Sequence, residues 1–215
     1  MQTINEFLKQ KKKLFIIGLM GGVASGKSTI GKIFETLGAQ LIEADSMAHR
    51  ILEYKRVKES IVKLWGDSLL IKGEIDRKAL GKIVFSGEKG KKSPDLIKLE
   101  KIVHPILRRR IFQRLQKLSQ KNHKIVVLDV ALLWENGLKD ICDILVFIDT
   151  PLSLRQQRAF QNRNWEESEV ILREKFQEDI EIKKQAAHFI VPNKGNMAET
   201  LQTVHVVWSK IQEMI

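Results

Sequence analysis

The stretch GGVASGKST, residues 21–29, decides the fold of this 215-residue chain. It satisfies the pattern G-x-x-x-x-G-K-[ST], and it lies between an apolar run and a helical pattern. The glycines allow a backbone loop whose N–H groups converge on phosphate oxygens, and the start of the following helix adds favourable partial charge. The motif and its flanks therefore predict a phosphate-binding loop between a strand and a helix.

The residue types within this loop indicate a nucleotide with magnesium. Lys27 would reach the β- and γ-phosphates, and Ser28 would ligate Mg²⁺. The dinucleotide fingerprint G-x-G-x-x-G is absent, which argues against nicotinamide binding. The predicted cofactor-binding residues of the loop are Gly22, Val23, Ala24, Ser25, Gly26, Lys27, Ser28 and Thr29.

The charge and cysteine content narrow the class of protein. Lys and Arg number 37 against 26 for Asp and Glu, a net charge of +11, which favours a polyanionic partner: nucleic acid, an anionic membrane or a small molecule with several phosphates. Cys142 is the only cysteine, so the chain forms no internal disulfide and no thiolate metal cluster, and it fits a reducing cytoplasm.

The basic and apolar start of the chain superficially resembles a signal peptide. We reject that interpretation because the apolar run 14–20 ends in a glycine-rich turn and a lysine, and no stretch approaches the ~18 apolar residues of a membrane span. We expect residues 1–13 to form an N-terminal extension and the protein to be cytoplasmic.

Apolar runs bounded by Gly, Pro, Asp or Asn alternate with helical patterns, which predicts an α/β fold with a parallel sheet flanked by helices. Helices are expected from Gly26 to Gly38, after Pro151, from Trp165 to Gln177 with a capping box from Asn164 to Glu167, and from Met197 onward. The predicted strands are 14–20, 39–44, 124–130, 144–149 and 188–191.

About 80 residues separate the second and third strands, far more than the ~12 of a plain crossover, so a helical insertion is expected. Its predicted helices span 46–65, 76–85 and 94–118, with Ser93 starting the last and Pro105 kinking or ending it. The domain prediction is an extension 1–13, a nucleotide-binding core of 14–45, 120–150 and 178–215, a helical insertion 46–119, and a lid 151–177.

Two aspartates end predicted strands, where parallel sheets form their ligand crevice. Asp129 would support Mg²⁺, although a solvent-facing carboxylate is the alternative. Asp45 would face the phosphate loop and accept a proton from an acceptor hydroxyl, or it would cap the helix that follows.

The segment after the fourth strand is rich in cations: Arg155, Arg158, Arg163, Arg173 and Lys175, with Gln177 at its end. We expect a lid whose guanidinium groups close over the phosphates and exclude water, while for any single arginine a solvated helix face is the alternative. The basic run 108–110 could contact nucleic acid, but a solvated helix face is favoured there.

Residues 193–196 read Asn-Lys-Gly-Asn, one residue away from the guanine-reading N-K-x-D, since an asparagine replaces the aspartate. ATP is therefore favoured over GTP, with Asn193 near the adenine edge, although a simple turn explains the segment equally well. The five histidines show no metal-ligand spacing.

The chain resembles the dephospho-CoA kinase family, P-loop kinases that use ATP to phosphorylate the ribose 3′-hydroxyl of dephospho-CoA. The resemblance runs nearly end to end. It is carried by the P-loop, Ala44-Asp45, Ile75-Asp76-Arg77, Val84-Phe85, His104-Pro105, Asp129 with Leu132-Leu133-Trp134-Glu135, Arg158, Arg173 with Gln177, and Asn193 with Gly195.

The resemblance implies a nucleotide-binding core, a helical CoA domain and a lid, with Asp45 as catalytic base beside Lys27 and Arg158 as catalytic residues. ATP and Mg²⁺ would be the cofactors, with Ser28 and Asp129 as metal ligands. Dephospho-CoA would be the acceptor partner, with neither an obligate nucleic acid nor a membrane. The acceptor-binding residues implied are Asp45, Arg77, Phe85, His104, Leu132 and Leu133.

Three positions depart from the family pattern. Ala131 stands where proline is usual, Asn162 replaces an expected lid arginine with Arg163 next to it, and His188 replaces an aspartate common near the adenine side. Two alternatives stay open: a P-loop kinase for another small molecule or nucleotide, and a nucleotide-dependent nucleic-acid-binding protein suggested by the net charge.

Overall fold

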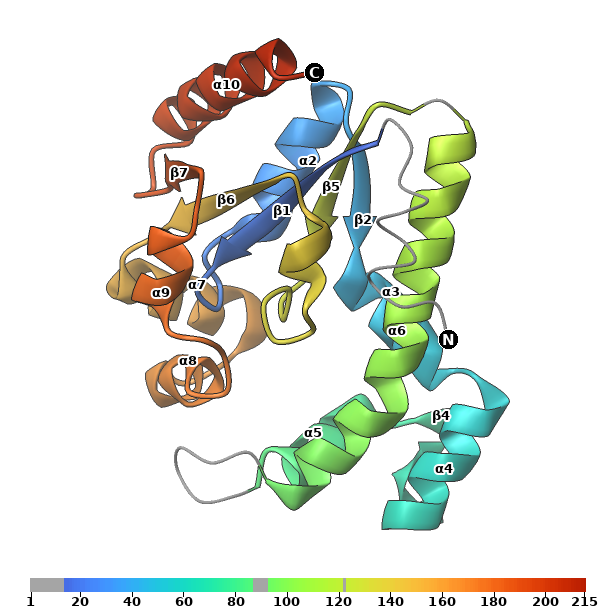
Figure 1. The fold of residues 1–215 in the computed structure, drawn as a ribbon. Coiled ribbons are helices and arrows are strands. Elements are labelled where there is room, and N and C mark those ends of the chain that lie inside the picture. The colour runs from blue at the N-terminus through green and yellow to red at the C-terminus, as the bar shows by residue number, and fades with distance from the viewer. Residues whose placement is uncertain (1–13, 87–92, 122) are drawn as a thin grey trace.

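The computed structural model describes residues 14–86, 93–121 and 123–215, so the predicted extension 1–13 lies outside the described residues. A five-stranded sheet in the order β2-β5-β1-β6-β7 forms the centre of the molecule, and all of its neighbouring strands run parallel (Figure 1). The strands are β1 (Phe15–Gly21), β2 (Gln40–Glu43), β5 (Ile125–Asp129), β6 (Ile144–Asp149) and β7 (Phe189–Pro192). The predicted parallel sheet is confirmed, with strand boundaries within two residues of those expected.

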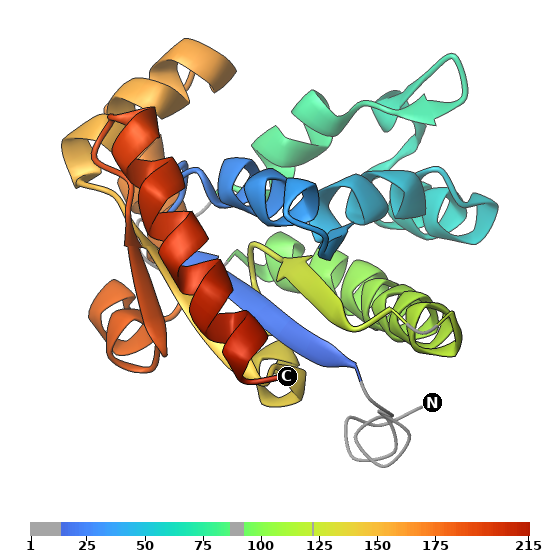
Figure 2. The same ribbon diagram turned by 90° about the horizontal axis from the view of Figure 1, so that it is seen from above.

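The two faces of the sheet carry separate parts of the core, because alternate side chains of a strand point to opposite faces. On β1, Ile17 and Leu19 pack with α2 (Lys27–Thr36) and α10 (Met197–Glu213), which lie on one side of the sheet (Figure 2). Ile16 and Met20 face the other side and join the core of the insertion. Both faces are therefore buried, which explains the continuous apolar runs in the sequence.

In its described residues, 46–86 and 93–119, the insertion holds four α-helices, a 3₁₀ helix (Asp67–Leu69) and a short hairpin, and it projects from the sheet in Figure 1. Its elements are α3 (Ala44–Leu52), α4 (Lys55–Trp65), the hairpin β3 (Leu70–Ile71) and β4 (Glu74–Ile75), α5 (Arg77–Val84) and α6 (Pro94–Gln120). The single helix predicted for 46–65 is wrong, since the chain breaks at 53–54 between α3 and α4. The helix α6 continues through Pro105, and Ser93 starts it by accepting a hydrogen bond from the backbone N–H of Leu96 at 3.0 Å.

The lid region contains α7 (Leu152–Arg163) and α8 (Glu167–Glu174), followed by α9 (Ile180–Gln185), which was not predicted. The predicted capping box at Asn164 is wrong. Asn164 adopts a left-handed conformation, φ 53°, and ends α7, while Glu166 precedes α8. Asparagine tolerates this conformation, so the same residue type serves the end of one helix as readily as the start of another.

The carboxyl ends of the strands meet at one edge of the sheet. The phosphate loop follows β1, Asp45 follows β2, Asp129 ends β5, and Asn193 follows β7. This edge therefore gathers the residues that the sequence singled out. Among the helices in the described parts of the chain, none is both long and apolar enough to cross a membrane.

Candidate active site

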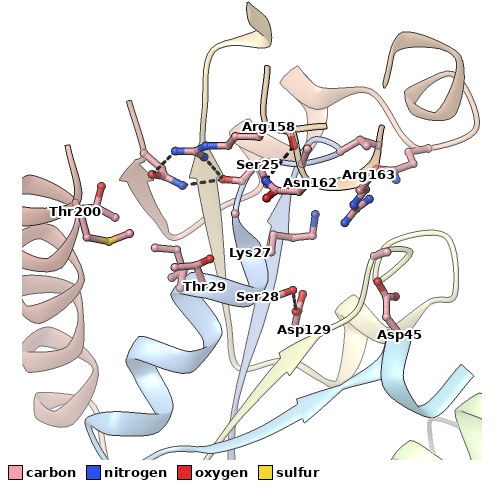
Figure 3. A pocket seen from close by; sticks show the side chains of 18 residues that line it. Ser25, Lys27, Ser28, Thr29, Asp45, Asp129, Arg158, Asn162, Arg163 and Thr200 are labelled. Atoms are coloured by element: carbon pink, nitrogen blue, oxygen red, sulfur yellow. Dashed lines mark hydrogen bonds between the residues drawn. The ribbon is translucent and has the colours of Figure 1, made fainter. Parts of the chain in front are cut away.

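A cavity of about 400 Å³ lies at this edge of the sheet, between the phosphate loop and the lid (Figure 3). Lys27, Asp45 and Arg163 extend into the same space from three different elements. Most of the predicted nucleotide-binding residues line it, whereas Gly22 does not. The lining residues are Val23, Ala24, Ser25, Gly26, Lys27, Ser28, Thr29, Ile30, Asp45, Asp129, Ala131, Arg158, Asn162, Arg163, Gln177, Asn193, Met197 and Thr200.

The phosphate loop has the backbone that its glycines were expected to permit. Gly26 takes φ 91° immediately before α2, a conformation that side chains disfavour. The Nζ of Lys27 donates to the carbonyls of Gly21 at 3.3 Å and Gly22 at 3.2 Å, so the lysine arches back over the loop. Burial lowers the pKa of Lys27, although the carboxylates of Asp129 and Asp45 oppose that shift.

Ser28 and Asp129 form the pair of oxygen ligands expected for magnesium. The Oγ of Ser28 donates to Oδ2 of Asp129 at 2.5 Å, which joins the start of α2 to the end of β5. Burial raises the pKa of Asp129, with the Ser28 hydrogen bond and the Lys27 charge opposing it. In the described part of the chain no cluster of three or more His, Cys, Asp or Glu side chains could hold a metal. One carboxylate and one hydroxyl suit Mg²⁺, which keeps several waters and takes further oxygens from substrate phosphates.

Asp45 lies in the first turn of α3, not at its cap. The residue that precedes α3 is Glu43, and no side chain caps the helix there. The helix-capping alternative for Asp45 is therefore wrong. The side chain is exposed and lines the cavity, and its carboxylate lies near enough to Lys27 to interact with it electrostatically.

Three side chains from the lid side and β7 hold one carbonyl of the phosphate loop. The oxygen of Ser25 accepts from Thr150 Oγ1 at 2.8 Å, from Asn193 Nδ2 at 2.8 Å and from Arg158 Nη1 at 3.3 Å. Arg158 also donates from Nη2 to Oδ1 of Asn193 at 3.2 Å, and burial lowers its pKa. Asn193 is 5% exposed, and its side chain holds the phosphate loop in place. A simple turn, the alternative that the sequence allowed, does not account for this contact.

A second brace lies beneath the loop, and sequence reasoning missed it. Glu174 on α8 accepts from the N–H of Val23 at 2.7 Å and pairs with the buried Arg155 on α7. Arg155 in turn donates from Nε to the carbonyl of Thr150 at 3.0 Å. A Cβ on Gly22 would collide with Nη1 of Arg155 and lie 2.5 Å from Oε1 of Glu174, so a larger residue there would displace this ion pair.

The cationic residues of the lid have different surroundings, and Lys175 is exposed to solvent. Arg158 and Arg163 line the cavity with Gln177, as expected for groups that bind phosphates. Arg155 is buried in its pair with Glu174.

Arg173 does not line the cavity, although it shares the Trp165 ring with Arg163, whose guanidinium carbon lies 4.7 Å from the ring centroid. The guanidinium carbon of Arg173 lies 3.9 Å from the ring centroid of Trp165 and 4.3 Å from that of Phe85. Burial lowers the pKa of Arg173. The arginine therefore joins α8 to the end of α5 in the insertion.

Most of the predicted acceptor-binding residues lie away from this cavity. Arg77 is exposed at the start of α5, while Phe85, His104 and Leu132 are half-buried. Leu133 is 3% exposed and packs against Gly18 of β1, which makes it a core residue. Asp45 is the only one of the six that lines the described cavity.

His188 lies at the amino end of β7, across the sheet from the cavity. Its Nδ1 accepts a hydrogen bond from the N–H of Leu145 at 3.0 Å, next to the start of β6. Asp143 does the same for Ile16 of β1 at 2.7 Å. His188 therefore accepts a hydrogen bond from a backbone N–H of β6, as the carboxylate of Asp143 does from a backbone N–H of β1.

A parallel sheet, a G-x-x-x-x-G-K-[ST] loop beside the Ser28–Asp129 pair, and arginines of α7 facing a carboxylate across one cavity are the features of a P-loop kinase. The similarity of this chain to known proteins agrees with that class. The family profile of dephospho-CoA kinase matches residues 15–199, most of the chain. The chain therefore belongs to the dephospho-CoA kinase family, which makes it a kinase of coenzyme A biosynthesis.

Individual relatives cover nearly the whole chain. Dephospho-CoA kinase of Thermobifida fusca is 35% identical over 93% of this chain and 97% of its own length. Dephospho-CoA kinase of Bacillus licheniformis is 30% identical over 92% of this chain and 98% of its own length. The solved structure of dephospho-CoA kinase from Campylobacter jejuni is 28% identical, with a TM-score of 0.62 over 93% of this chain and 98% of that one.

The fold is shared more widely. Shikimate kinase from Acinetobacter baumannii gives a TM-score of 0.52 at 16% identity, over 96% of this chain and 97% of that one. At this identity the similarity concerns the fold alone.

Proposed function

We propose that this chain transfers the γ-phosphate of ATP to the ribose 3′-hydroxyl of dephospho-CoA, giving ADP and coenzyme A. The observation that carries the proposal is one cavity in which Asp45, Lys27 and the Ser28–Asp129 pair face the same space. A kinase needs a base for the acceptor, a cation for the phosphates and oxygen ligands for magnesium, and these residues supply each of them.

The phosphate loop and the lid would bind the triphosphate. Lys27 places a positive charge on the β- and γ-phosphates, and loop N–H groups hold their oxygens. Arg158 and Arg163 neutralise negative charge that moves toward the β,γ-bridge as the bond breaks. We infer that Arg163 replaces the family arginine missing at Asn162, because both residues line the cavity.

Ser28 and Asp129 would hold Mg²⁺, which would offset the negative charge of the phosphates. Their contact already places a hydroxyl and a carboxylate side by side. Asn193 would lie near the adenine, where its brace to the loop also orders that edge of the cavity.

Asp45 would act on the acceptor. Its carboxylate accepts the proton of the ribose 3′-hydroxyl while that oxygen attacks the γ-phosphorus, and the bond to the ADP oxygen breaks. The exposed position of Asp45 at the start of the insertion suits this role, because the acceptor must enter from solvent between the insertion and the lid.

The helical insertion would bind the rest of dephospho-CoA. Arg77 would offer a charge to its phosphates, and Phe85, His104 and Leu132 would contribute surface that becomes accessible with the acceptor present. Leu133, which is buried, would support the loop after β5 from the core. The protein would act in the reducing cytoplasm, and it would need neither a membrane nor a nucleic acid as a partner.

The test is to incubate the protein with MgATP and dephospho-CoA and to determine the product mass and the position of the new phosphate. A mass gain of one phosphate on the ribose 3′-oxygen is expected. Consumption of ATP only with a different nucleoside or small metabolite would assign the chain to another kinase activity. Binding to RNA or DNA with a dissociation constant in the micromolar range or tighter, without phosphoryl transfer, would favour a nucleic-acid-binding role.

A further inference from the structure

A buried lysine, Lys183 on α9, lies at the centre of a polar network beside the cavity. Its side chain is 4% exposed, and its Nζ lies 3.1 Å from Oε1 of Glu135, on the loop after β5. The same Nζ donates to Oε1 of Gln177, just beyond α8, at 3.1 Å. The Glu135 oxygen also accepts the N–H of Glu178 at 2.7 Å. Three separate segments of the chain therefore meet at one ammonium group.

This network determines which way the Gln177 amide faces. A lysine ammonium is only a donor, so the oxygen of the amide must face Lys183, and the NH₂ group must face away from it. Gln177 lines the cavity that contains the phosphate loop. Among the described residues, Nε2 of Gln177 has no hydrogen-bond acceptor. The amide is thus held with a free donor beside a site for anions.

The burial of Lys183 gives this arrangement its rigidity. Removing an ammonium from water costs several kcal/mol unless it is paired and hydrogen-bonded, and the Glu135 carboxylate with the Gln177 oxygen provides those partners. A Gln177 side chain turned by 180° would place its NH₂ against the ammonium and leave that charge with one partner fewer. The flipped orientation is therefore disfavoured.

We propose that Gln177 donates a hydrogen bond from Nε2 to a phosphate oxygen of the bound nucleotide, and that Lys183 is the positioning residue that holds the amide in this orientation. The proposal rests on the proposed function only in taking the cavity to be the nucleotide site. It does not depend on which acceptor is phosphorylated.

The experiment is a double-mutant cycle on nucleotide affinity. The dissociation constant of a non-hydrolysable ATP analogue with Mg²⁺ is measured by calorimetry for the wild type, Gln177→Met, Lys183→Met and the double variant. Gln177→Met should weaken binding about fivefold, as expected for one lost hydrogen bond. Lys183→Met should weaken binding about as much when Gln177 is present, and less than about twofold when it is added to Gln177→Met.

Two controls separate positioning from general damage. Gln161→Met, an exposed glutamine on α7, should leave the affinity unchanged. If Lys183→Met does not fold, Lys183→Met combined with Glu135→Gln removes both buried charges and takes its place in the cycle.

The outcomes are decisive. Equal losses from Lys183→Met in both backgrounds would show that the lysine acts on the fold and not through Gln177, and an unchanged affinity of Gln177→Met would overturn the proposal. Failure of the wild type to phosphorylate dephospho-CoA, with the cycle behaving as expected, would refute the proposed function and leave this inference intact.

Discussion

The carboxylate of Glu174 accepts a hydrogen bond from the backbone N–H of Val23 at 2.7 Å, which ties the lid helix α8 to the phosphate loop. The same carboxylate pairs with Arg155, whose side chain is 7% exposed. The loop thus has its conformation supported from below by residues that lie far along the chain, before any nucleotide binds. The loop is therefore held by a contact from α8 as well as by the backbone conformations of its own glycines.

Replacement of Glu174 by alanine should lower the free energy of unfolding by about 3 kcal/mol, because it leaves the buried Arg155 charge without its carboxylate partner. Glu174→Gln should cost less, since the amide oxygen still accepts from Val23. Urea unfolding of both variants measures this, with exposed Lys175→Ala as the control expected to change stability by less than about 0.5 kcal/mol. A Glu174→Ala protein as stable as the control would contradict the brace.

Lys27→Ala should lower the rate of phosphoryl transfer by about 10² to 10³ without loss of the fold. Burial lowers the pKa of Lys27, so the folded protein disfavours the charge, and its removal does not destabilise the protein. In the wild type, the contribution of this group to stability rises with pH between its lowered pKa and the ordinary value of 10.5. Single-turnover transfer and thermal melting test both parts; wild-type turnover would refute the loop assignment.

Asp45→Asn should reduce turnover by about 10² or more, while nucleotide affinity stays within a few-fold, because only the basic carboxylate is lost. The melting temperature should not change, since Asp45 does not cap α3. Asp140→Asn, an exposed aspartate elsewhere, serves as the control. Near-normal 3′-phosphorylation of dephospho-CoA by the Asp45 variant would exclude the residue as the base.

Asp129→Asn should abolish magnesium-dependent transfer and raise the free energy of unfolding at pH 7 by about 1 kcal/mol. Burial raises the pKa of Asp129, so the folded state binds its proton more tightly, and stability from this group falls as pH rises from 3.8 through the raised value. The gain over the wild type should therefore shrink as the pH is lowered to the ordinary aspartate range. A variant less stable than the wild type at pH 7 would show that the Ser28 bond outweighs desolvation.

Much of the fold could be predicted from the sequence, because each strand is buried on both faces and so appears as an uninterrupted apolar run. Errors arose where short-range signals have two structural outcomes. Asn164 ends a helix instead of starting one, and the turn at Lys72 and Gly73 joins two strands too short to show a pattern. The residues at strand ends were placed correctly, since parallel topology alone brings them together.

The braces of the site could not be predicted in the same way. Glu174 with Val23, and Lys183 with Glu135, join residues far apart in the chain, and a glutamate or a lysine on a helix carries no sign that it is buried. Arg173 looked like another phosphate ligand, yet aromatic rings at Trp165 and Phe85 take up its guanidinium. Only the packing of the lid against the insertion decides between these roles.

The long helix α6 contains a point at which it bends most easily, at Pro105. At 27 residues it spans about 40 Å, and its C-terminal half, from Leu107 to Leu118, is fixed in the core. Pro105 lacks an N–H, so the helix loses a hydrogen bond to Lys101 and its bending stiffness is lowest there. A bend of about 10° at this hinge would move the start of the helix, roughly 16 Å away, by about 3 Å. We therefore expect any shift of the insertion relative to the sheet to be accommodated by a bend at Pro105.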